Sequence, residues 1–363
     1  MGCGMGRYTI RTILAAGLLS LGIAGCSHGA GEPVQHISAD AVPPSSQLSS
    51  AARNILAQMK VETAPAAIAG NLAQQRAFYG AWNDRRLAEM NRAFATIDTR
   101  SEIGGVPVDV VTPQGGIALA NRNRVLINVH GGAFMWGAGS GALVEAIPIA
   151  ATGRIKVVTV DYRLAPEHTY PAASEDVAAV YRALLDEYPA ANVGIYGCSA
   201  GGIITAQATA WFAAHGLPRP GAIGTFCGTG APYSGDSPYL SAFLGREKMP
   251  PPAGLPKQTA NPYLIDVPRD DCTAYPLTCD ATTAAMPPTL LLAGGRDFAA
   301  SALTLAHRRL AAAGVKSELY LFDGLPHAFF MWPDMPESHE AFARIVDFFD
   351  RHLGRAPRAA DRQ

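Results

Sequence analysis

This 363-residue sequence has little net charge and few charged side chains. Its 29 basic and 30 acidic residues leave a formal net charge of -1, and charged residues make up only 16% of the chain. No run of five or more charged residues is present. Proteins that bind nucleic acids or acidic surfaces usually present a basic face, so the composition gives no reason to expect a nucleic-acid partner.

The sequence also lacks the usual patterns of metal ligands. None of its six cysteines forms a C-x-x-C pair, and its histidines do not cluster. Zinc sites in proteins are typically built from such closely spaced ligands. We therefore expect neither a metal ion nor another cofactor.

The N-terminus contains an apolar run that is too short to span a bilayer. Ile13 to Ile23 follows Arg7 and Arg11, which is typical of a signal peptide. The run ends in Ile23-Ala24-Gly25-Cys26, which resembles the lipobox of bacterial lipoproteins, where the cysteine becomes lipidated. We expect an exported protein that is anchored to a bacterial membrane through Cys26, at the outer membrane or the periplasmic face if there are two membranes. The alternative is an ordinary secretory peptide cleaved nearby.

Composition and periodicity divide the chain into segments. A small, polar, proline-containing stretch predicts a flexible tether, and a helical pattern broken near Pro65 follows it. A later stretch rich in proline and glycine predicts a lid or binding loop, because long irregular connections in compact domains usually have such roles. The predicted segments are a signal peptide (1–25), the tether (26–50), N-terminal helices (51–97), a large domain (98–353) with an irregular insertion (228–288), and a C-terminal tail (354–363).

Within 98–353, apolar runs that predict buried strands alternate with helical patterns. This alternation predicts an α/β fold whose mainly parallel sheet has helices on both faces. The strands are predicted at 106–111, 124–130, 156–160, 193–196, 222–226, 289–293 and 318–322, and the helices at 142–151, 173–185, 200–214, 301–313 and 339–352.

A Gly-x-Ser-x-Gly run lies between one of these strands and the helix that follows. Gly197-Cys198-Ser199-Ala200-Gly201 would form a sharp turn that exposes the Ser199 hydroxyl as a nucleophile. The alternative is a glycine-rich turn with an idle serine. A serine nucleophile needs a base and a group that orients the base. Asp297 and His327 each follow a later strand, and Ser199, Asp297, His327 is the order of α/β-hydrolases.

Donors for a developing oxyanion are also available in the sequence. His130-Gly131-Gly132-Ala133-Phe134 follows the buried strand at 124–130, and its adjacent glycines would let N–H groups point at a substrate carbonyl. We expect the oxyanion to be bound by Gly131, Gly132 or Ala133 together with Ala200. A simple tight turn is the alternative.

These motifs together resemble the bacterial hormone-sensitive-lipase-like branch of the α/β-hydrolase esterases. The matching segments are 130–134, Asp161-Tyr162-Arg163-Leu164-Ala165-Pro166-Glu167-His168, 197–202, Asp297 and Pro326-His327-Ala328-Phe329. The resemblance covers roughly 98–353. It implies an eight-stranded α/β-hydrolase sheet and a helical cap formed by the N-terminal helices and the insertion. It also implies Ser199 as nucleophile, His327 as base and acid, and Asp297 as its orienter, while the segment from Tyr162 to Pro171 braces the fold.

Two residues depart from the family pattern. Ala133 replaces the third glycine of the His-Gly-Gly-Gly motif, and its Cβ restricts the backbone. Cys198 replaces the aspartate that precedes the nucleophile in the Gly-Asp-Ser-Ala-Gly-Gly motif. Neither change removes a member of the triad.

We therefore expect a serine carboxylesterase that hydrolyses short-chain acyl esters through an acyl-enzyme intermediate. Phe134, Trp136 and cap aromatics indicate an apolar pocket of limited depth. Two alternatives remain: a deacetylase or amidase that acts on cell-envelope material with the same triad, and a weakly active, lipid-anchored binding protein.

Export makes disulfides permissible among the remaining cysteines. Cys272 and Cys279 flank a short loop, and a bridge between them is the favoured pairing. We expect Cys198 and Cys227 to be free, buried residues at the ends of adjacent strands.

Overall fold

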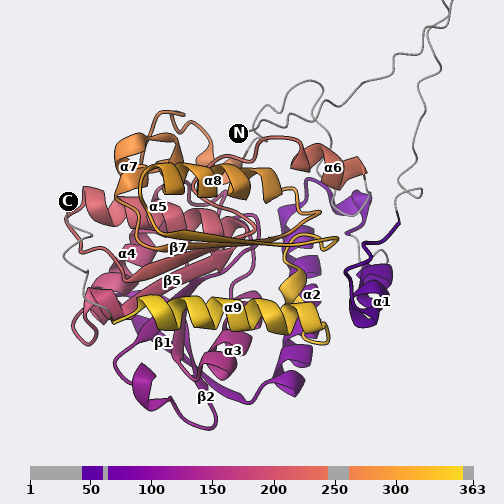
Figure 1. Ribbon diagram of the computed structural model, residues 1–363, viewed down its shortest axis with the longest axis horizontal. Helices are drawn as coiled ribbons and strands as arrows, with labels where there is room; N and C mark the ends of the chain where they lie inside the picture. The colour runs from indigo at the N-terminus through magenta and orange to yellow at the C-terminus, as the bar shows by residue number, and fades with distance from the viewer. Residues whose placement is uncertain (1–42, 60–63, 244–260, 355–363) are drawn as a thin grey trace, which may run out of the picture. The chain divides into compact units, whose positions relative to one another are not determined.

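A computed structural model describes residues 43–59, 64–243 and 261–354. Within them, eight strands form one sheet in the order β1-β2-β4-β3-β5-β6-β7-β8 (Figure 1). The β1–β2 and β2–β4 pairs are antiparallel, and the remaining pairs are parallel. The predicted α/β-hydrolase architecture with an eight-stranded, mainly parallel sheet is therefore confirmed.

The central strands are apolar because helices cover both faces of the sheet. β3, β5, β6 and β7 are buried along their whole lengths, as expected for parallel strands between two helical layers. The strands are β1 (Thr96–Ile103), β2 (Val106–Pro113), β3 (Val125–Val129), β4 (Lys156–Val160), β5 (Val193–Cys198), β6 (Ala222–Phe226), β7 (Thr289–Gly294) and β8 (Ser317–Phe322).

Only β1 had no counterpart among the strands predicted from apolar runs. Its residues Thr-Ile-Asp-Thr-Arg-Ser-Glu-Ile are mostly polar, and six of the eight are exposed. The strand forms through its antiparallel ladder with β2 at the edge of the sheet. Hydrophobic periodicity detects buried faces, so it gives little signal for an exposed edge strand.

The helices lie in two layers. In Figure 1, α3 and α9 lie on one face of the sheet, and α4, α5 and α8 lie on the other. Among the described residues, no helix is long and apolar enough to cross a membrane. The helices are α1 (Ser50–Met59), α2 (Leu72–Ala93), α3 (Ser140–Gly153), α4 (Ala172–Leu184), α5 (Ala200–Ala214), α6 (Ser237–Phe243), α7 (Asp280–Ala284), α8 (Ala300–Ala312) and α9 (Pro336–His352).

The tether prediction is wrong for residues 43–50. Leu48 is buried in the core, and the Ser49 N–H and hydroxyl both donate to Glu337 at the start of α9. The Arg296 guanidinium donates to the Pro43 carbonyl at 2.9 Å. A polar composition suggested a free segment, but one apolar side chain and several specific hydrogen bonds hold this part in place. The signal peptide, Cys26 and the tail beyond Gly354 lie outside the described residues.

The segment from Tyr162 to Pro171 makes the bracing contacts that the resemblance implies. Glu167 pairs with Arg76 of α2 at 2.7 Å, and the same guanidinium donates to the carbonyls of Met135 and Ala165. Arg163 pairs with Asp176 at 2.9 Å. The contacts of Arg76 attach α2 to the loops that follow β3 and β4.

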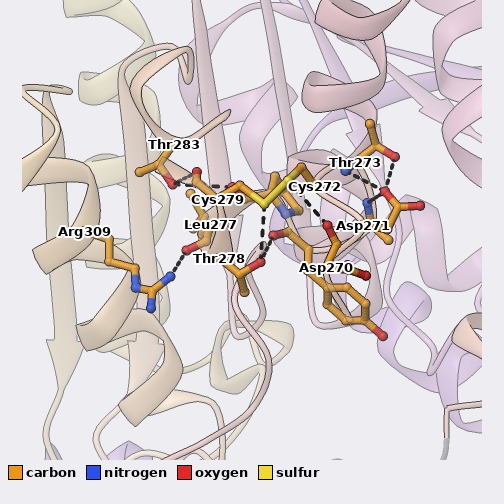
Figure 2. The surroundings of a disulfide bond; sticks show 12 residues. Asp270, Asp271, Cys272, Thr273, Leu277, Thr278, Cys279, Thr283 and Arg309 are labelled. Atoms are coloured by element: carbon orange, nitrogen blue, oxygen red, sulfur yellow. Dashed lines mark hydrogen bonds between the residues drawn. A yellow bond between two sulfur atoms is a disulfide. The ribbon is translucent and has the colours of Figure 1, made fainter. Parts of the chain in front are cut away.

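The insertion contains a disulfide between Cys272 and Cys279, the pairing favoured from the sequence (Figure 2). Hydrogen bonds order the loop that it closes: Asp271 Oδ1 accepts from the N–H and hydroxyl of Thr273, and Arg309 of α8 donates to the Leu277 carbonyl. Cys198 and Cys227 are buried and do not form a disulfide, also as predicted.

Removing this disulfide is expected to lower the stability of the fold. Because the bridge restricts the unfolded chain, the double variant Cys272→Ser/Cys279→Ser should lose about 2–3 kcal/mol of unfolding free energy for a loop this short. Urea denaturation measures the loss. The control is dithiothreitol, which should weaken the wild type and leave the double variant unchanged. An equal effect of the reductant on both proteins would contradict the assignment.

Candidate active site

The serine of the Gly-x-Ser-x-Gly run lies in a strained turn between β5 and α5. Ser199 has φ 57° and ψ -122°, a conformation that L-residues rarely adopt. We call residues 197–201 the elbow. The turn is tight enough that a Cβ on Gly201 would lie 1.8 Å from the Val129 carbonyl oxygen, so only glycine fits there. The geometry is that of a nucleophile elbow.

Asp297 and His327 meet at the carboxyl ends of β7 and β8. His327 Nδ1 donates to Asp297 Oδ1 at 2.9 Å, and Asp297 has no exposed surface. Asp297 Oδ1 also accepts from the Ala299 N–H at 2.7 Å, just before α8 begins. Asp297 therefore orients the histidine and also accepts a hydrogen bond from the turn that leads into α8. With Nδ1 donating, Nε2 of His327 is the nitrogen available to accept a proton.

The loop at residues 130–134, which we call the oxyanion loop, requires one correction. The Gly131 N–H donates to Glu145 Oε1 at 2.8 Å, so Gly131 is not an available oxyanion donor. The N–H groups of Gly132 and Ala133 have no hydrogen-bond acceptor within the described ranges. Ala133 and Phe134 have φ of 52° and 65°, so this loop holds two non-glycine residues in the left-handed region. Such residues cost about 1–2 kcal/mol each, and strain of this kind is concentrated at functional sites.

His130 packs against the backbone of the oxyanion loop. It is fully buried, its Nδ1 lies 2.7 Å from the Gly131 carbonyl, and its ring stacks on Tyr162 with centroids 4.3 Å apart. The Tyr162 hydroxyl donates to the His130 carbonyl at 2.9 Å. Burial lowers the pKa of His130 to about 4, so the ring is neutral and structural near pH 7.

A cavity of about 250 Å³ opens beside Ser199. Phe134 lines it as predicted, but Trp136 does not; Trp136 stacks on Tyr79 of α2 at 4.4 Å instead. Among described residues, the cap side of the cavity comes from the insertion rather than from the N-terminal helices. The lining consists mainly of apolar side chains, with residues 133–135, 199–200, 203, 229–233, 261–262, 264, 274–275 and 298 contributing.

Two aromatic residues that the sequence did not indicate connect the cavity to the triad. Phe298 stacks on the His327 ring at 4.3 Å, and Tyr233 packs edge-on against Phe298 at 5.0 Å. The Tyr233 hydroxyl donates to the Cys227 carbonyl at 3.3 Å and interacts with Ser199, while burial raises its pKa well above the usual value. Phe298 directly follows Asp297 in the sequence, which could have indicated it; Tyr233 lies in the irregular insertion, which gave no signal.

One group of possible metal ligands occurs in the described part of the chain. Atoms of Cys227, Asp297 and His327 lie within 4.8 Å of one another. Asp297 and His327 already bond to each other, and burial raises the pKa of Cys227 and so disfavours the thiolate that a metal would require. These residues fit a proton-transfer site better than a metal site.

Relatives in sequence resemble this chain to different extents. LipR of Mycobacterium tuberculosis is 38% identical over 130 residues, which are 35% of this chain and 41% of LipR. The carboxylesterase/phospholipase LipF of the same species is 27% identical over 300 residues, or 74% of this chain and 76% of LipF. The chain thus spans less than half of LipR and about three quarters of LipF.

Solved structures match over a larger share of the chain. The esterase E25 has a TM-score of 0.73 and 28% identity, covering 86% of this chain and 97% of that structure. An esterase from the bacterial hormone-sensitive lipase family has a TM-score of 0.70 and 24% identity, covering 84% and 99%, and shares the fold. A family model described as alpha/beta hydrolase fold matches residues 126–331. Together with the elbow, the Asp297–His327 pair and the sheet order, these matches show that the chain belongs to the α/β-hydrolase family.

Proposed function

We propose that this protein is a serine carboxylesterase that hydrolyses short-chain acyl esters through an acyl-enzyme. The observation that carries the proposal is the arrangement at one edge of the sheet: a strained elbow serine, a histidine hydrogen-bonded to a buried aspartate, and an apolar cavity beside them. The names of LipF and of the esterase E25 support the same class of reaction.

In the proposed first step, the Ser199 hydroxyl oxygen attacks the ester carbonyl carbon while Nε2 of His327 accepts the hydroxyl proton. Asp297 stabilises the imidazolium through its bond to Nδ1. The carbonyl oxygen becomes an oxyanion that accepts hydrogen bonds from the N–H groups of Ala200 and of Gly132 or Ala133. Ala200 is the first residue of α5, where the helix dipole also favours negative charge.

The tetrahedral intermediate then collapses and the carbon–oxygen bond to the alcohol breaks. His327 returns the proton to the departing alkoxide oxygen, which leaves Ser199 acylated. A water molecule gives a proton to His327 and attacks the acyl carbon, and collapse of the second intermediate releases the carboxylic acid and restores Ser199. No cofactor is required by this sequence of steps.

Loss of the Ser199 hydroxyl is expected to abolish hydrolysis. Ser199→Ala should reduce kcat/KM for p-nitrophenyl acetate by about 10⁴-fold or more, since triad nucleophiles contribute at this scale. The matched control is Ser338→Ala, which removes another buried serine hydroxyl that donates to a backbone carbonyl and does not line the cavity. A fluorophosphonate probe should label the wild type and the control at Ser199. Unlabelled, correctly folded wild type would favour the binding-protein alternative.

The size of the cavity sets an expectation for the acyl chain. At about 250 Å³ it lies below the usual 300–1,000 Å³ of pockets for drug-sized ligands, so short chains should fit best. In a p-nitrophenyl ester series, activity should be highest from acetate to butyrate. Leu264→Ala should enlarge the cavity and shift the preference toward longer chains by two or more carbons. Leu240→Ala, which removes an exposed leucine of α6 outside the cavity, should not. An unchanged preference in Leu264→Ala would show that the cavity does not hold the acyl group.

We also propose that Cys26 anchors the exported protein to a bacterial membrane. The support is the sequence alone: a short apolar run behind two arginines, ending in a lipobox-like segment. Each buried methylene of an attached acyl chain contributes about 0.8 kcal/mol to membrane binding.

Replacement of the lipobox cysteine tests this anchor. Cys26→Ala should move the expressed protein from the membrane fraction to the soluble fraction, whereas Cys3→Ala, which lies within the signal segment, should leave it on the membrane. Fractionation followed by immunoblotting measures the distribution. Retention of Cys26→Ala on the membrane would refute the anchor.

A further inference from the structure

A buried carboxylate that the proposed reaction does not use lies directly behind the active site. Glu145 belongs to α3 and is only 5% exposed, within a helix whose other buried residues are small or apolar. A charged or polar group in such surroundings destabilises the fold unless its oxygens receive hydrogen bonds. The donors around Glu145 therefore indicate why it is there.

Three donors converge on this carboxylate, and they come from different segments of the site. Oε1 accepts from the Gly131 N–H at 2.8 Å, and Oε2 accepts from Asn128 Nδ2 at 3.1 Å and from the Cys198 N–H at 3.3 Å. Gly131 lies in the oxyanion loop, and Cys198 immediately precedes the nucleophile. The Glu145 side chain thus accepts hydrogen bonds from the oxyanion loop and from the elbow at the same time.

The packing around Gly131 shows that the oxyanion loop and the elbow are in close contact. A Cβ on Gly131 would lie 2.9 Å from the Cys198 carbonyl oxygen, 3.3 Å from Glu145 Oε1 and 3.4 Å from Ser199 Cβ. The loop therefore lies between the carboxylate and the elbow. Its distance from the elbow matters because the proposed oxyanion donors come from both: Gly132 or Ala133 from the loop and Ala200 from the elbow. Oxyanion donors act at about 2.7–3.1 Å, so a small displacement removes their effect.

The residue before the nucleophile departs from the signature that the chain resembles. Cys198 is buried, where that signature has an aspartate. At this point in the site the carboxyl group belongs to Glu145 of α3, and it accepts a hydrogen bond from the backbone N–H of Cys198. Burial raises the pKa of Glu145 to about 7, while its hydrogen bonds to Gly131, Asn128 and Cys198 act to lower it.

We infer that Glu145 is a positioning residue: by accepting hydrogen bonds from Gly131 and Cys198 together, it fixes the oxyanion loop at a set distance from the elbow. It does not touch the reacting atoms. It acts through the N–H groups that bind the oxyanion, and the inference rests on the proposed Ser199 mechanism. Loss of the carboxylate should therefore reduce the stabilisation of the transition state by the oxyanion donors. Substrate binding in the apolar cavity should stay nearly unchanged.

Two substitutions at this position test the inference. Glu145→Gln keeps the size of the side chain but has only one acceptor oxygen. Its amide NH₂ group must therefore face the backbone N–H of either Gly131 or Cys198, which leaves that N–H without its acceptor. Glu145→Met keeps a similar volume and offers no acceptor oxygen. We expect kcat for p-nitrophenyl butyrate to fall about 10-fold in Glu145→Gln and about 100-fold in Glu145→Met, with KM within threefold of wild type.

A tetrahedral analogue provides a readout that a merely structural role would not change. Butaneboronic acid forms a tetrahedral adduct with a nucleophilic serine and places an oxygen in the oxyanion site. Its inhibition constant should rise in both variants by about the same factor as kcat/KM falls. The matched control is Val144→Ala, which makes a cavity at the neighbouring buried position of α3. It should lower the melting temperature without changing kcat or the inhibition constant more than twofold.

The outcomes separate this inference from the proposed function. Ser199→Ala is assayed beside the other variants. If hydrolysis depends on Ser199 and folded Glu145→Gln keeps wild-type kcat and boronate affinity, the positioning role is overturned while the esterase assignment stands. A kcat loss matched by Val144→Ala, or a loss seen only in KM, also overturns it. If wild-type hydrolysis is independent of Ser199, both the function and the inference fall. Because Glu145→Gln preserves volume and one acceptor, it remains informative if Glu145→Met does not fold.

Discussion

The site depends on one close backbone contact, where the N-terminus of α5 meets the end of β3. Gly201 approaches the Val129 carbonyl so closely that no side chain could be placed between them. This contact sets the elbow beside the loop that follows β3, because the parallel β3–β5 ladder brings Val129 opposite Gly197. Ser199 and the oxyanion loop are therefore brought together by the sheet itself, and the helices are arranged around that junction.

Two kinds of support surround the junction. On one side, Arg76 and Tyr162 hold the two ends of the oxyanion loop by donating to the carbonyls of Met135 and His130. On the other, Asp297 after β7 orients His327 after β8, and Phe298 stacks on the imidazole ring. Glu145 belongs to neither set, since it binds the loop and the elbow simultaneously. Burying a carboxyl group destabilises the fold through desolvation. Its hydrogen bonds here give the proposed oxyanion donors a fixed geometry, which explains why the group is present.

Much of the fold could be predicted because buried strands and amphipathic helices leave a periodic record in the sequence. The seven buried or half-buried strands and the main helices were found in this way, whereas the exposed edge strand β1 was not. The disulfide was predicted from the spacing of Cys272 and Cys279 and from the expectation that the chain is exported. The tether was drawn too far, through residue 50, because composition could not show that Leu48 is buried or that Ser49 bonds to Glu337.

The sequence by itself determined the family and the candidate triad, because Ser199, Asp297 and His327 each follow a strand in a recognisable motif. It also contained one indication of the role of Glu145, because this glutamate is the single charged residue in the apolar stretch Ala-Leu-Val-Glu-Ala-Ile of α3. Only the tertiary structure decided that the Gly131 N–H is occupied and that Trp136 stacks on α2 and does not line the cavity. It also decided that, among the described residues, the insertion lines the cavity and the N-terminal helices do not. The physical reason is that these facts concern the direction of individual groups between segments far apart in the chain, and local pattern contains no information about such directions.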